Sequence, residues 1–264
     1  MANTLFIGKV YLQFDELSST NDYAGELLVS AGLSAGHGYA KSKPAEGTVV
    51  RADSQSAGRG QFGSRWESAA GKNLTFSVIL YPSWLEIGAQ FSLSMAVALA
   101  VHDAIGSLHN NDLPIRIKWP NDLYIGGRKT AGILIQNALS AGSIQSSIVG
   151  IGLNVNQLAF DPSLPNPTSL ASSFGREFDL NQVADTLFEC LERRYLQLKA
   201  GQSVPIRQAY ESLLYRRGLE TGFTDTATGT DFTGIILGVT DAGQLRVLTE
   251  QGERMFGVKE ILYR

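Results

Sequence analysis

A glycine- and arginine-rich segment, residues 58–66, has the composition of an anion-binding loop. It reads Gly58-Arg59-Gly60-Gln61-Phe62-Gly63-Ser64-Arg65-Trp66. Glycines let backbone N–H groups approach a ligand closely, and guanidinium groups supply forked donors suited to a carboxylate or a phosphate. The indole adds a stacking surface for a nucleotide base. We call residues 58–66 the clamp and predict that they bind an anion. The alternative is a solvated loop whose glycines only form turns.

The glycines of the clamp also match the spacing G-x-G-x-x-G of dinucleotide-binding proteins, but their context does not fit that motif. The motif requires a helix after the third glycine and an acidic residue about 20 positions further on. Residues 73–81 are instead β-branched and aromatic, which predicts a strand. Residues 47–53 predict another strand before the clamp. We therefore expect the clamp to connect two paired strands.

The composition is that of a globular protein with one sizeable domain and a small appendage. The chain has 264 residues, of which 44% are hydrophobic and 18% are charged. The net charge of −3 provides no general field for nucleic acid. The single cysteine, Cys190, falls on the apolar face of a predicted helix, where a buried hydrophobe is expected rather than a nucleophile. The three histidines have no metal-ligand spacing, which argues against a zinc site.

The N-terminal residues do not form a signal peptide, because no basic stretch precedes a long apolar run. No segment reaches the roughly 18 apolar residues that a membrane span needs. We therefore expect a cytoplasmic protein that associates with no membrane.

The first elements place a polar sequence at the start of a helix. Residues 9–17 alternate apolar and polar side chains, which predicts a strand, and a helix is expected to begin at Ser18 or Ser19. The triplet Ser19-Thr20-Asn21 then lies at the helix N-terminus, where hydroxyl and free N–H groups can meet a ligand. The alternative is that Ser19 only caps the helix. Residues 31–46, rich in glycine and serine, are expected to be a connection.

The middle of the chain predicts a buried helix followed by a hairpin. Residues 85–108 are apolar nearly all round, which is typical of a helix packed on a sheet. A short strand at 115–119 ends before Pro120, and residues 123–125 and 131–136 form a predicted hairpin with Lys129 at its corner. A lysine at such a corner is by default a solvated charge, and its surroundings do not match a Walker motif.

The second half of the chain predicts one glycine-containing strand, two helices and a small β-barrel. The strand at 147–155 contains Gly150 and Gly152, which leave room for a group to approach its backbone. Helical spacing follows at 180–198 and around 204–215. From residue 218 onward, short alternating strands predict the barrel. The predicted domains are therefore residues 1–217 and 218–264.

Five motifs, taken in order and spacing, resemble the biotin protein ligases. They are Ser19-Thr20-Asn21; residues 55–60 with Trp66; Lys118-Trp119-Pro120-Asn121-Asp122; Arg128-Lys129 with Gly132; and Gly150 to Asn154. The resemblance covers residues 10–160, and residues 218–264 look like the C-terminal SH3-like domain of that family. It implies an α+β fold: a mixed, mainly antiparallel sheet packed by helices, as in class II aminoacyl-tRNA synthetases, with a small SH3-like β-barrel.

The resemblance implies an enzyme that makes biotinyl-5′-AMP from biotin and Mg·ATP. The biotinyl group then passes to one lysine of a biotin carboxyl carrier protein, such as that of acetyl-CoA carboxylase. The residue chemistry agrees, because joining a carboxylate to an α-phosphate needs clustered cations and no nucleophile of the enzyme.

The resemblance also implies roles for individual residues. Biotin binding falls to Ser19, Thr20, Asn21, Gln55, Gly58, Arg59, Gly60, Lys129, Gly132 and Gly150. Binding of ATP or the adenylate falls to Arg59, Trp66, Lys118, Asn121, Lys129 and Asn154. Catalysis falls to Lys129, Arg59, Asn121 and Asp122. In this assignment Lys129 bridges carboxylate and α-phosphate, and Trp66 covers the adenine. The metal ligands are not assigned.

Two departures from the family bear on function. Gln61 stands where many family members carry arginine, which puts retention of the adenylate in doubt. The chain begins within a few residues of its first predicted strand, so no DNA-binding domain of the repressor-type ligases is expected, and no specific binding of operator DNA.

The sequence leaves two other functions open: a lipoate or octanoate ligase, and a biotin sensor that binds without transferring. The clamp together with residues 118–122 favours biotin over lipoate. The presence of Lys129 argues against a sensor. The sequence leaves the oligomeric state open, a homodimer included.

Overall fold

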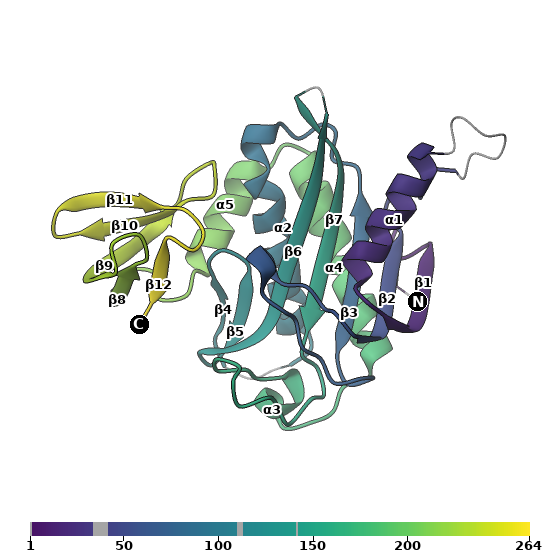
Figure 1. Ribbon diagram of the computed structural model, residues 1–264, viewed down its shortest axis with the longest axis horizontal. Coiled ribbons are helices and arrows are strands. Elements are labelled where there is room, and N and C mark those ends of the chain that lie inside the picture. The colour runs from purple at the N-terminus through teal and green to yellow at the C-terminus, as the bar shows by residue number, and fades with distance from the viewer. Residues whose placement is uncertain (1, 34–41, 110–112, 141) are drawn as a thin grey trace.

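The computed structural model describes residues 2–33, 42–109, 113–140 and 142–264, which form a seven-stranded and a five-stranded sheet (Figure 1). The strands of the larger sheet are β1 (Tyr11–Leu17), β2 (Val49–Gln55), β3 (Leu74–Leu80), β4 (Ile115–Lys118), β5 (Asp122–Ile125), β6 (Arg128–Ser140) and β7 (Ser143–Leu153). Their order is β1-β2-β3-β7-β6-β5-β4. β1 and β2 are parallel, and the remaining neighbours pair antiparallel. The expected mixed, mainly antiparallel sheet is confirmed.

The predicted connection between two strands by the clamp is confirmed as well. β2 and β3 pair antiparallel, with Val49 opposite Val78, and the clamp lies between their ends. The predicted hairpin is β5 and β6, and the predicted strand at 147–155 is β7. Because β3 and β7 occupy the middle of the sheet, they are buried on both faces and read as nearly continuous apolar runs.

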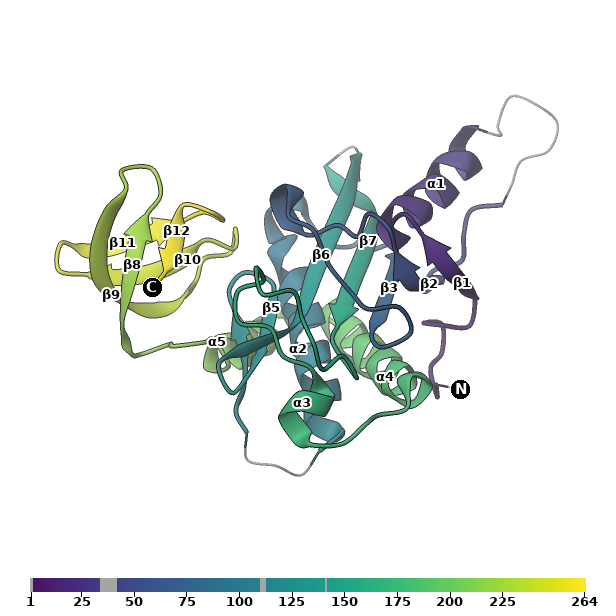
Figure 2. The same ribbon diagram turned by 60° about the horizontal axis from the view of Figure 1, so that its bottom comes forward.

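Helices cover both faces of the larger sheet. They are α1 (Thr20–Leu33), α2 (Phe91–Ser107), α3 (Leu170–Phe174), α4 (Leu180–Lys199) and α5 (Ser203–Ser212). α1 packs on β2, β3 and β7, whereas α2 and α4 lie together on the opposite face (Figures 1 and 2). The predicted connection at 31–46 begins later than expected, because α1 continues to Leu33; its residues 34–41 lie outside the described residues. α3 was not predicted, since five residues are too few for a periodic pattern.

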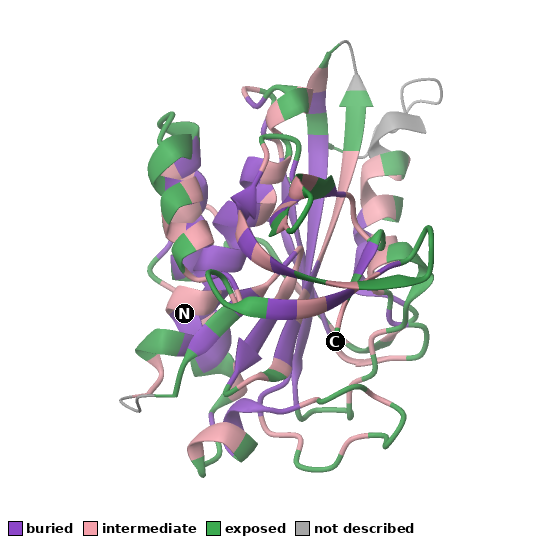
Figure 3. Ribbon diagram, turned by 90° about the vertical axis from the view of Figure 1, so that its left-hand side faces the viewer, coloured by how far each residue is buried: buried purple, intermediate pink, exposed green. Residues whose placement is uncertain are grey.

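The core divides into a large and a small apolar cluster on the two faces of the sheet. The large cluster joins β3, β7 and β6 to α2 and α4, and the small one lies under α1 around Ala24, Val50 and Ile79. Figure 3 shows buried residues along the central strands and exposed residues on the outer loops. Cys190 is buried, and burial raises the pKa of its thiol, as expected for a small hydrophobe rather than a nucleophile.

Among the described residues, one helix reaches the length and apolarity of a membrane span, contrary to the expectation from sequence. The stretch Ile87–Ser107 has 21 residues and a mean hydropathy of 1.2. More than half of it, 56%, is buried inside the fold, where α2 packs on α4 and the sheet. Its apolar composition is therefore explained by its place in the core.

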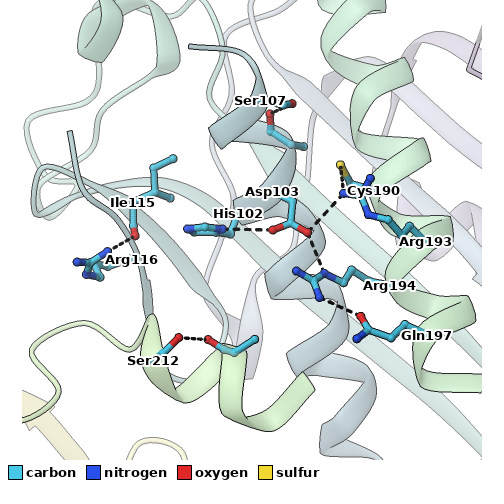
Figure 4. Close-up of polar contacts among 12 residues, drawn as sticks. His102, Asp103, Ser107, Ile115, Arg116, Cys190, Arg193, Arg194, Gln197 and Ser212 are labelled. Carbon is cyan, nitrogen blue, oxygen red and sulfur yellow. Dashed lines mark hydrogen bonds and ion pairs between the residues drawn. The ribbon is translucent and has the colours of Figure 1, made fainter. Parts of the chain in front are cut away.

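An ionic cluster joins α2 to α4 on the face away from α1 (Figure 4). Asp103 accepts a hydrogen bond from Arg194 Nε at 2.8 Å, while Arg193 Nη2 and His102 Nδ1 each lie 3.5 Å from its oxygens. Burial alone would raise the pKa of Asp103. The hydrogen bonds from His102 and Arg194 outweigh burial and lower the pKa to about 2.

The five-stranded sheet is formed by the C-terminal residues. Its strands are β8 (Glu220–Asp225), β9 (Thr230–Val239), β10 (Leu245–Thr249), β11 (Gly252–Phe256) and β12 (Ile261–Tyr263), in the order β11-β10-β9-β8-β12. All neighbouring pairs are antiparallel. The sheet curls into the small barrel that the sequence predicted, consistent with an SH3-like domain (Figure 2). The exact domain limits, 1–217 and 218–264, stay a prediction.

The turn between β9 and β10 docks the second sheet on the first part of the chain. Trp119 Nε1 donates a hydrogen bond to Gly243 O at 2.9 Å, and Glu211 Oε1 accepts one from Val239 N at 3.0 Å. A Cβ at Gly243 would lie 2.4 Å from the ring of Phe91, so this turn approaches α2 as closely as glycine permits. The second sheet is thereby fixed beside the loop that carries Asn121.

Candidate active site

A cleft of about 200 Å³ opens on the face of the sheet that carries α1. Its lining includes twelve of the predicted site residues: Ser19, Thr20, Asn21, Gln55, Arg59, Gly60, Trp66, Asn121, Asp122, Lys129, Gly132 and Gly150. These residues come from the start of α1, from β2, from the clamp and from the strands β5, β6 and β7. Residues far apart in the chain therefore meet in one site.

At the α1 end, the cleft is lined by buried polar groups that already have partners. Ser19 Oγ accepts from Asp22 N at 3.4 Å and so caps the helix. Gln55 Oε1 accepts from Thr20 N at 2.8 Å, which satisfies one of the free N–H groups at the helix start. Ser19 therefore is a cap and a lining residue at once, so the two readings of this triplet do not exclude each other.

Two residues missed in the sequence complete this end. Ser77 Oγ, on β3, lies 2.8 Å from Thr20 Oγ1 and 2.6 Å from Asn21 Oδ1. Gln136, on β6, accepts from Asn21 Nδ2 at 2.9 Å. The one available signal was the hydroxyl of Ser77 in the middle of an apolar run, because a buried polar group needs a partner.

At the α1 end, glycine is required at position 150 because the Asn21 side chain lies against its backbone. A Cβ at Gly150 would lie 2.1 Å from Asn21 Oδ1, well inside contact distance. The expectation that the glycines of β7 leave room for another group therefore holds, and at Gly150 that group is the carboxamide of Asn21.

The clamp is folded as a tight hairpin with its own backbone hydrogen bonds. Gly60 N donates to Ser64 O at 2.7 Å, and Trp66 N donates to Gly58 O at 3.0 Å. The tip is a single turn, Gln61–Gly63, in which Phe62 has a φ of 53°. A Cβ at Gly58 would lie 2.4 Å from Trp66 O, so Gly58 serves the hairpin and lies outside the lining of the cleft.

Two cations at the middle of the cleft are each paired with a carboxylate. Lys129 Nζ lies 2.7 Å from Asp122 Oδ1, and both side chains are partly exposed, at 31% and 22%. Arg59 forms an ion pair with Asp22 on the first turn of α1. Lys129 is the second residue of β6, just past the predicted hairpin corner, and its backbone is fixed because Lys129 N donates to Asn166 O at 2.9 Å. A ligand with negative charge can replace either carboxylate.

Trp66 lies on a platform of two glycines. Gly132 on β6 and Gly152 on β7 are opposite each other in the sheet. A Cβ would lie 3.1 Å from the indole at Gly132 and 2.2 Å from it at Gly152. The indole Nε1 is buried and has no hydrogen-bond partner among the described residues. A buried donor without a partner is costly, so an acceptor from a ligand would be stabilising there.

Comparison with known proteins shows the family of this chain. Residues 34–154 match the Biotin/lipoate A/B protein ligase family. The bifunctional ligase/repressor BirA of Bacillus subtilis is 34% identical over 255 residues, which cover 94% of this chain and 72% of that protein. The chain belongs to the biotin protein ligase family.

A second relative and a solved structure support the same membership. The ligase is 32% identical to the biotin--[acetyl-CoA-carboxylase] ligase of Paracoccus denitrificans over 218 residues, covering 81% of this chain and 89% of the relative. The biotin protein ligase of Aquifex aeolicus in complex with biotin and ATP has a TM-score of 0.74 and 26% identity. The match covers 97% of this ligase and 99% of that chain.

Lys118 of the ligase lies beside the cleft, outside its lining. Its Nζ is 3.3 Å from Tyr124 Oη and 4.9 Å from the ring centroid of Tyr263 on the second sheet. Burial lowers the pKa of Lys118, Asp122 opposes this, and Lys129 lowers it further. The contact of Lys118 with ATP stays a prediction, and its charge acts on Asp122 and Lys129.

Asn154 of the ligase also lies outside the lining of the cleft. Its Nδ2 donates to Thr168 O at 3.0 Å, and its backbone N donates to Thr130 O at 2.8 Å. These bonds tie the end of β7 to the segment before α3. Its Oδ1 is buried without a partner in the described part of the chain, so the carboxamide retains one acceptor. Its contact with the adenine edge stays a prediction.

Proposed function

We propose that this ligase makes biotinyl-5′-AMP from biotin and ATP and passes the biotinyl group to one lysine of a biotin carboxyl carrier protein. Relatives named as biotin--[acetyl-CoA-carboxylase] ligases support the acceptor, and the Aquifex aeolicus complex with biotin and ATP supports the two substrates. The observation that carries the proposal is one cleft with a buried polar end next to the paired cations Arg59 and Lys129.

The polar end suits the ureido group of biotin. Such a group offers one carbonyl acceptor and two N–H donors. Ser19, Thr20 and Asn21 line that end with hydroxyl and carboxamide groups, all less than 5% exposed. An acid that displaces the bonds among these groups without matching them leaves a buried polar group unpaired, which costs about 1–3 kcal/mol, so a site of this kind rejects such acids.

The cations suit the first chemical step. One oxygen of the biotin carboxylate attacks the α-phosphorus, a P–O bond forms, and pyrophosphate leaves with the electron pair of the bond that breaks. Both reactants are anions, so the step needs charge neutralisation and alignment. Lys129 and Arg59 supply this once the incoming anions displace Asp122 and Asp22.

Magnesium fits the site as a partner of ATP. Across the described residues there is no cluster of three or more His, Cys, Asp or Glu, so a cage built by the protein alone is not present in that part of the chain. Asp122 is the one carboxylate among the described residues lining the cleft. Mg²⁺ commonly binds through one or two carboxylates and substrate phosphates. Asp122 and Asn121 would hold it on the nucleotide, where it neutralises phosphate charge.

The second step transfers the acyl group. The amine of the carrier lysine attacks the acyl carbon, a C–N bond forms, and AMP leaves as the C–O bond breaks. The amine loses a proton in this step, and Asp122, the carboxylate that lines the cleft beside Lys129, would accept it. Asn121 is held for this step by its hydrogen bond to Ile133 O at 2.7 Å.

Intact mass spectrometry tests the proposal. Purified ligase, biotin, Mg·ATP and a carrier domain should give a carrier heavier by one biotinyl group, and a carrier variant with its acceptor lysine changed to arginine should gain nothing. Lipoate in place of biotin should give no product. A carrier that gains lipoyl instead would contradict the substrate. Pyrophosphate release without any acyl transfer would contradict the second step.

A further inference from the structure

The second sheet contributes a cation to the cleft. Lys259, in the turn between β11 and β12, lines the cleft together with Val258. Its Nζ donates a hydrogen bond to Phe62 O, at the tip of the clamp, at 2.9 Å and lies 5.2 Å from the centroid of the Phe62 ring. Residues 197 positions apart in the chain therefore meet at the rim of the site.

Both partners of this contact have an unusual backbone. Lys259 has a φ of 68° and Phe62 a φ of 53°, so the contact joins two of the four non-glycine residues with positive φ in the described chain. Such conformations persist where the surrounding structure enforces them, and they concentrate at ligand clamps and active sites. Here the turn is held by Thr226 Oγ1, which donates to Lys259 O at 2.6 Å. The backbone of this turn is therefore held independently of the bond between Lys259 and Phe62.

The charge of Lys259 is not neutralised in this structure. Four cations line the cleft, and two of them, Arg59 and Lys129, are paired with carboxylates. Lys259 and Arg65 have no carboxylate within ion-pair distance among the described residues. An ammonium has three donors, and one carbonyl and an aromatic ring are weaker partners than phosphate oxygens. Lys259 thus keeps charge available for an anion.

The position of Lys259 along the cleft determines which part of a bound anion it can contact. The second sheet adjoins β4 and β5, at the opposite edge of the sheet from β1 and α1 (Figure 1). The cleft therefore runs from the polar α1 end, past Lys129, to Lys259. With a carboxylate and an α-phosphate at Lys129, Lys259 and Arg65 are the lining cations left to meet the remaining phosphates.

We propose that Lys259 binds the β- and γ-phosphates of ATP, and the pyrophosphate that leaves, in exchange for its bond to Phe62 O. The second sheet is then part of the nucleotide site, and the clamp tip is released from it when ATP binds. This inference rests on the proposed function, because it takes ATP as the substrate.

Binding measurements on three variants test this assignment. Calorimetry at fixed salt compares ATP and AMP on the full-length wild type, Lys259→Met and Lys259→Arg. Lys259→Met should weaken ATP binding by about 10-fold, the scale of one hydrogen bond to a charged group, and leave AMP and biotin unchanged. Lys259→Arg should recover most of the loss. Lys199→Met, which removes an exposed lysine from the end of α4, is the charge-matched control and should bind ATP as wild type does.

The outcomes separate this inference from the proposed function. An equal loss for ATP and AMP, a loss of biotin binding, or no change in ATP binding would each overturn the role of Lys259. A wild type that binds no ATP would overturn both proposals. If wild type binds ATP but forms no biotinyl-5′-AMP, the proposed function fails, and the ATP-to-AMP ratio still decides the role of Lys259.

Discussion

The two ends of the cleft achieve binding by different physical means. At the α1 end, Thr20 and Asn21 are each 4% exposed and are joined to Gln55, Ser77 and Gln136 by neutral hydrogen bonds. In the middle, Lys129 and Arg59 are 31% and 48% exposed and belong to ion pairs. The first end is fixed by folding, whereas the second is held by charges that water already reaches.

This difference suits the two tasks of a ligase. Neutral groups that are buried and hydrogen-bonded to one another can discriminate between acids. An acid that displaces these bonds without matching them leaves a buried group unpaired. Partly exposed ion pairs contribute little stability, about 0–1 kcal/mol, and so exchange partners at low cost. The negative charge bound in the cleft changes when pyrophosphate leaves and again when AMP leaves. Lys129 and Arg59 can exchange partners at each of these steps.

The largest expected effect comes from removing the charge at the centre. Lys129→Ala should reduce biotinyl-5′-AMP formation by at least about 100-fold, since a preorganised charge on the transition state is lost. Lys129→Arg should also be poor, because a planar fork does not replace a compact ammonium. Pyrophosphate release measures the rate, and Lys199→Ala is the control. Near-normal pyrophosphate release from Lys129→Ala would show that Lys129 and its ion pair with Asp122 have no role in the reaction.

A substitution at the α1 end should instead act on binding. Gly150→Ala places a methyl group against Asn21 and should weaken biotin affinity by about 10-fold or more, while AMP affinity stays unchanged. Gly106→Ala, where a Cβ meets no atom within 4 Å, is the matched control. Calorimetry with each ligand gives both numbers. If AMP binding fell as much as biotin binding, the two ends would not be independent.

Much of the difference between the two ends of the cleft was predictable from local sequence. The strand alternation placed the clamp between β2 and β3. It also placed Lys129 at the corner of a hairpin, whereas Lys129 lies in β6 opposite Tyr124, because β6 already begins at Arg128. Gly150 was recognised because glycine in a strand often marks close approach. These inferences depend on residues near each other in the chain or on the five motifs in order.

The remaining features depend on which strands become neighbours. Ser77 and Gln136 join the α1 end through the order β3-β7-β6, which no local pattern encodes. Lys118 is the last residue of β4, and its side chain points to the face of the sheet opposite that of Ile117. There Tyr124 of β5 and Tyr263 of the second sheet lie beside its ammonium group. Lys259 enters the cleft through docking of the second sheet. Each of these placements requires tertiary structure.

A substitution in the clamp should have a smaller effect, on how well the ligase retains the adenylate. Gln61 lines the cleft without charge, so we expect the adenylate to leak and to label bystander lysines diffusely. Gln61→Arg should reduce that labelling by about 3-fold, the scale of one partly exposed charge. Mass spectrometry of a mixture with an unrelated protein measures it. Equal labelling by both proteins would show that charge at this position does not govern retention.

Ordering of the clamp can be followed at the same time. The clamp has few apolar anchors, so ligand should protect it by adding contacts. Cleavage at Arg59 or Arg65 by trypsin should slow when biotin and ATP are both present. Equal cleavage in both states would show that the clamp does not close on the ligand.

The smallest effect on activity is expected from the ionic cluster on the far face. The folded pKa of Asp103, about 2, lies below its unfolded value, so its stabilisation is complete above about pH 4 and is lost as pH falls toward 2. Asp103→Asn should lower the free energy of unfolding by about 1 kcal/mol at pH 7, after allowance for partial exposure. Urea titrations at pH 7 and pH 3 should show a difference that shrinks at the lower pH. Altered adenylate formation at pH 7 would mean that this cluster reaches the cleft.

The turn at Gly243 has a consequence for how the protein can be divided. Removing everything after residue 217 would leave the Trp119 indole without its acceptor and would expose the ring of Phe91. A truncated catalytic fragment would therefore gain an apolar patch and an unpaired indole donor. Soluble expression of such a fragment should be poor, and the intact chain should melt in one cooperative transition despite having two sheets.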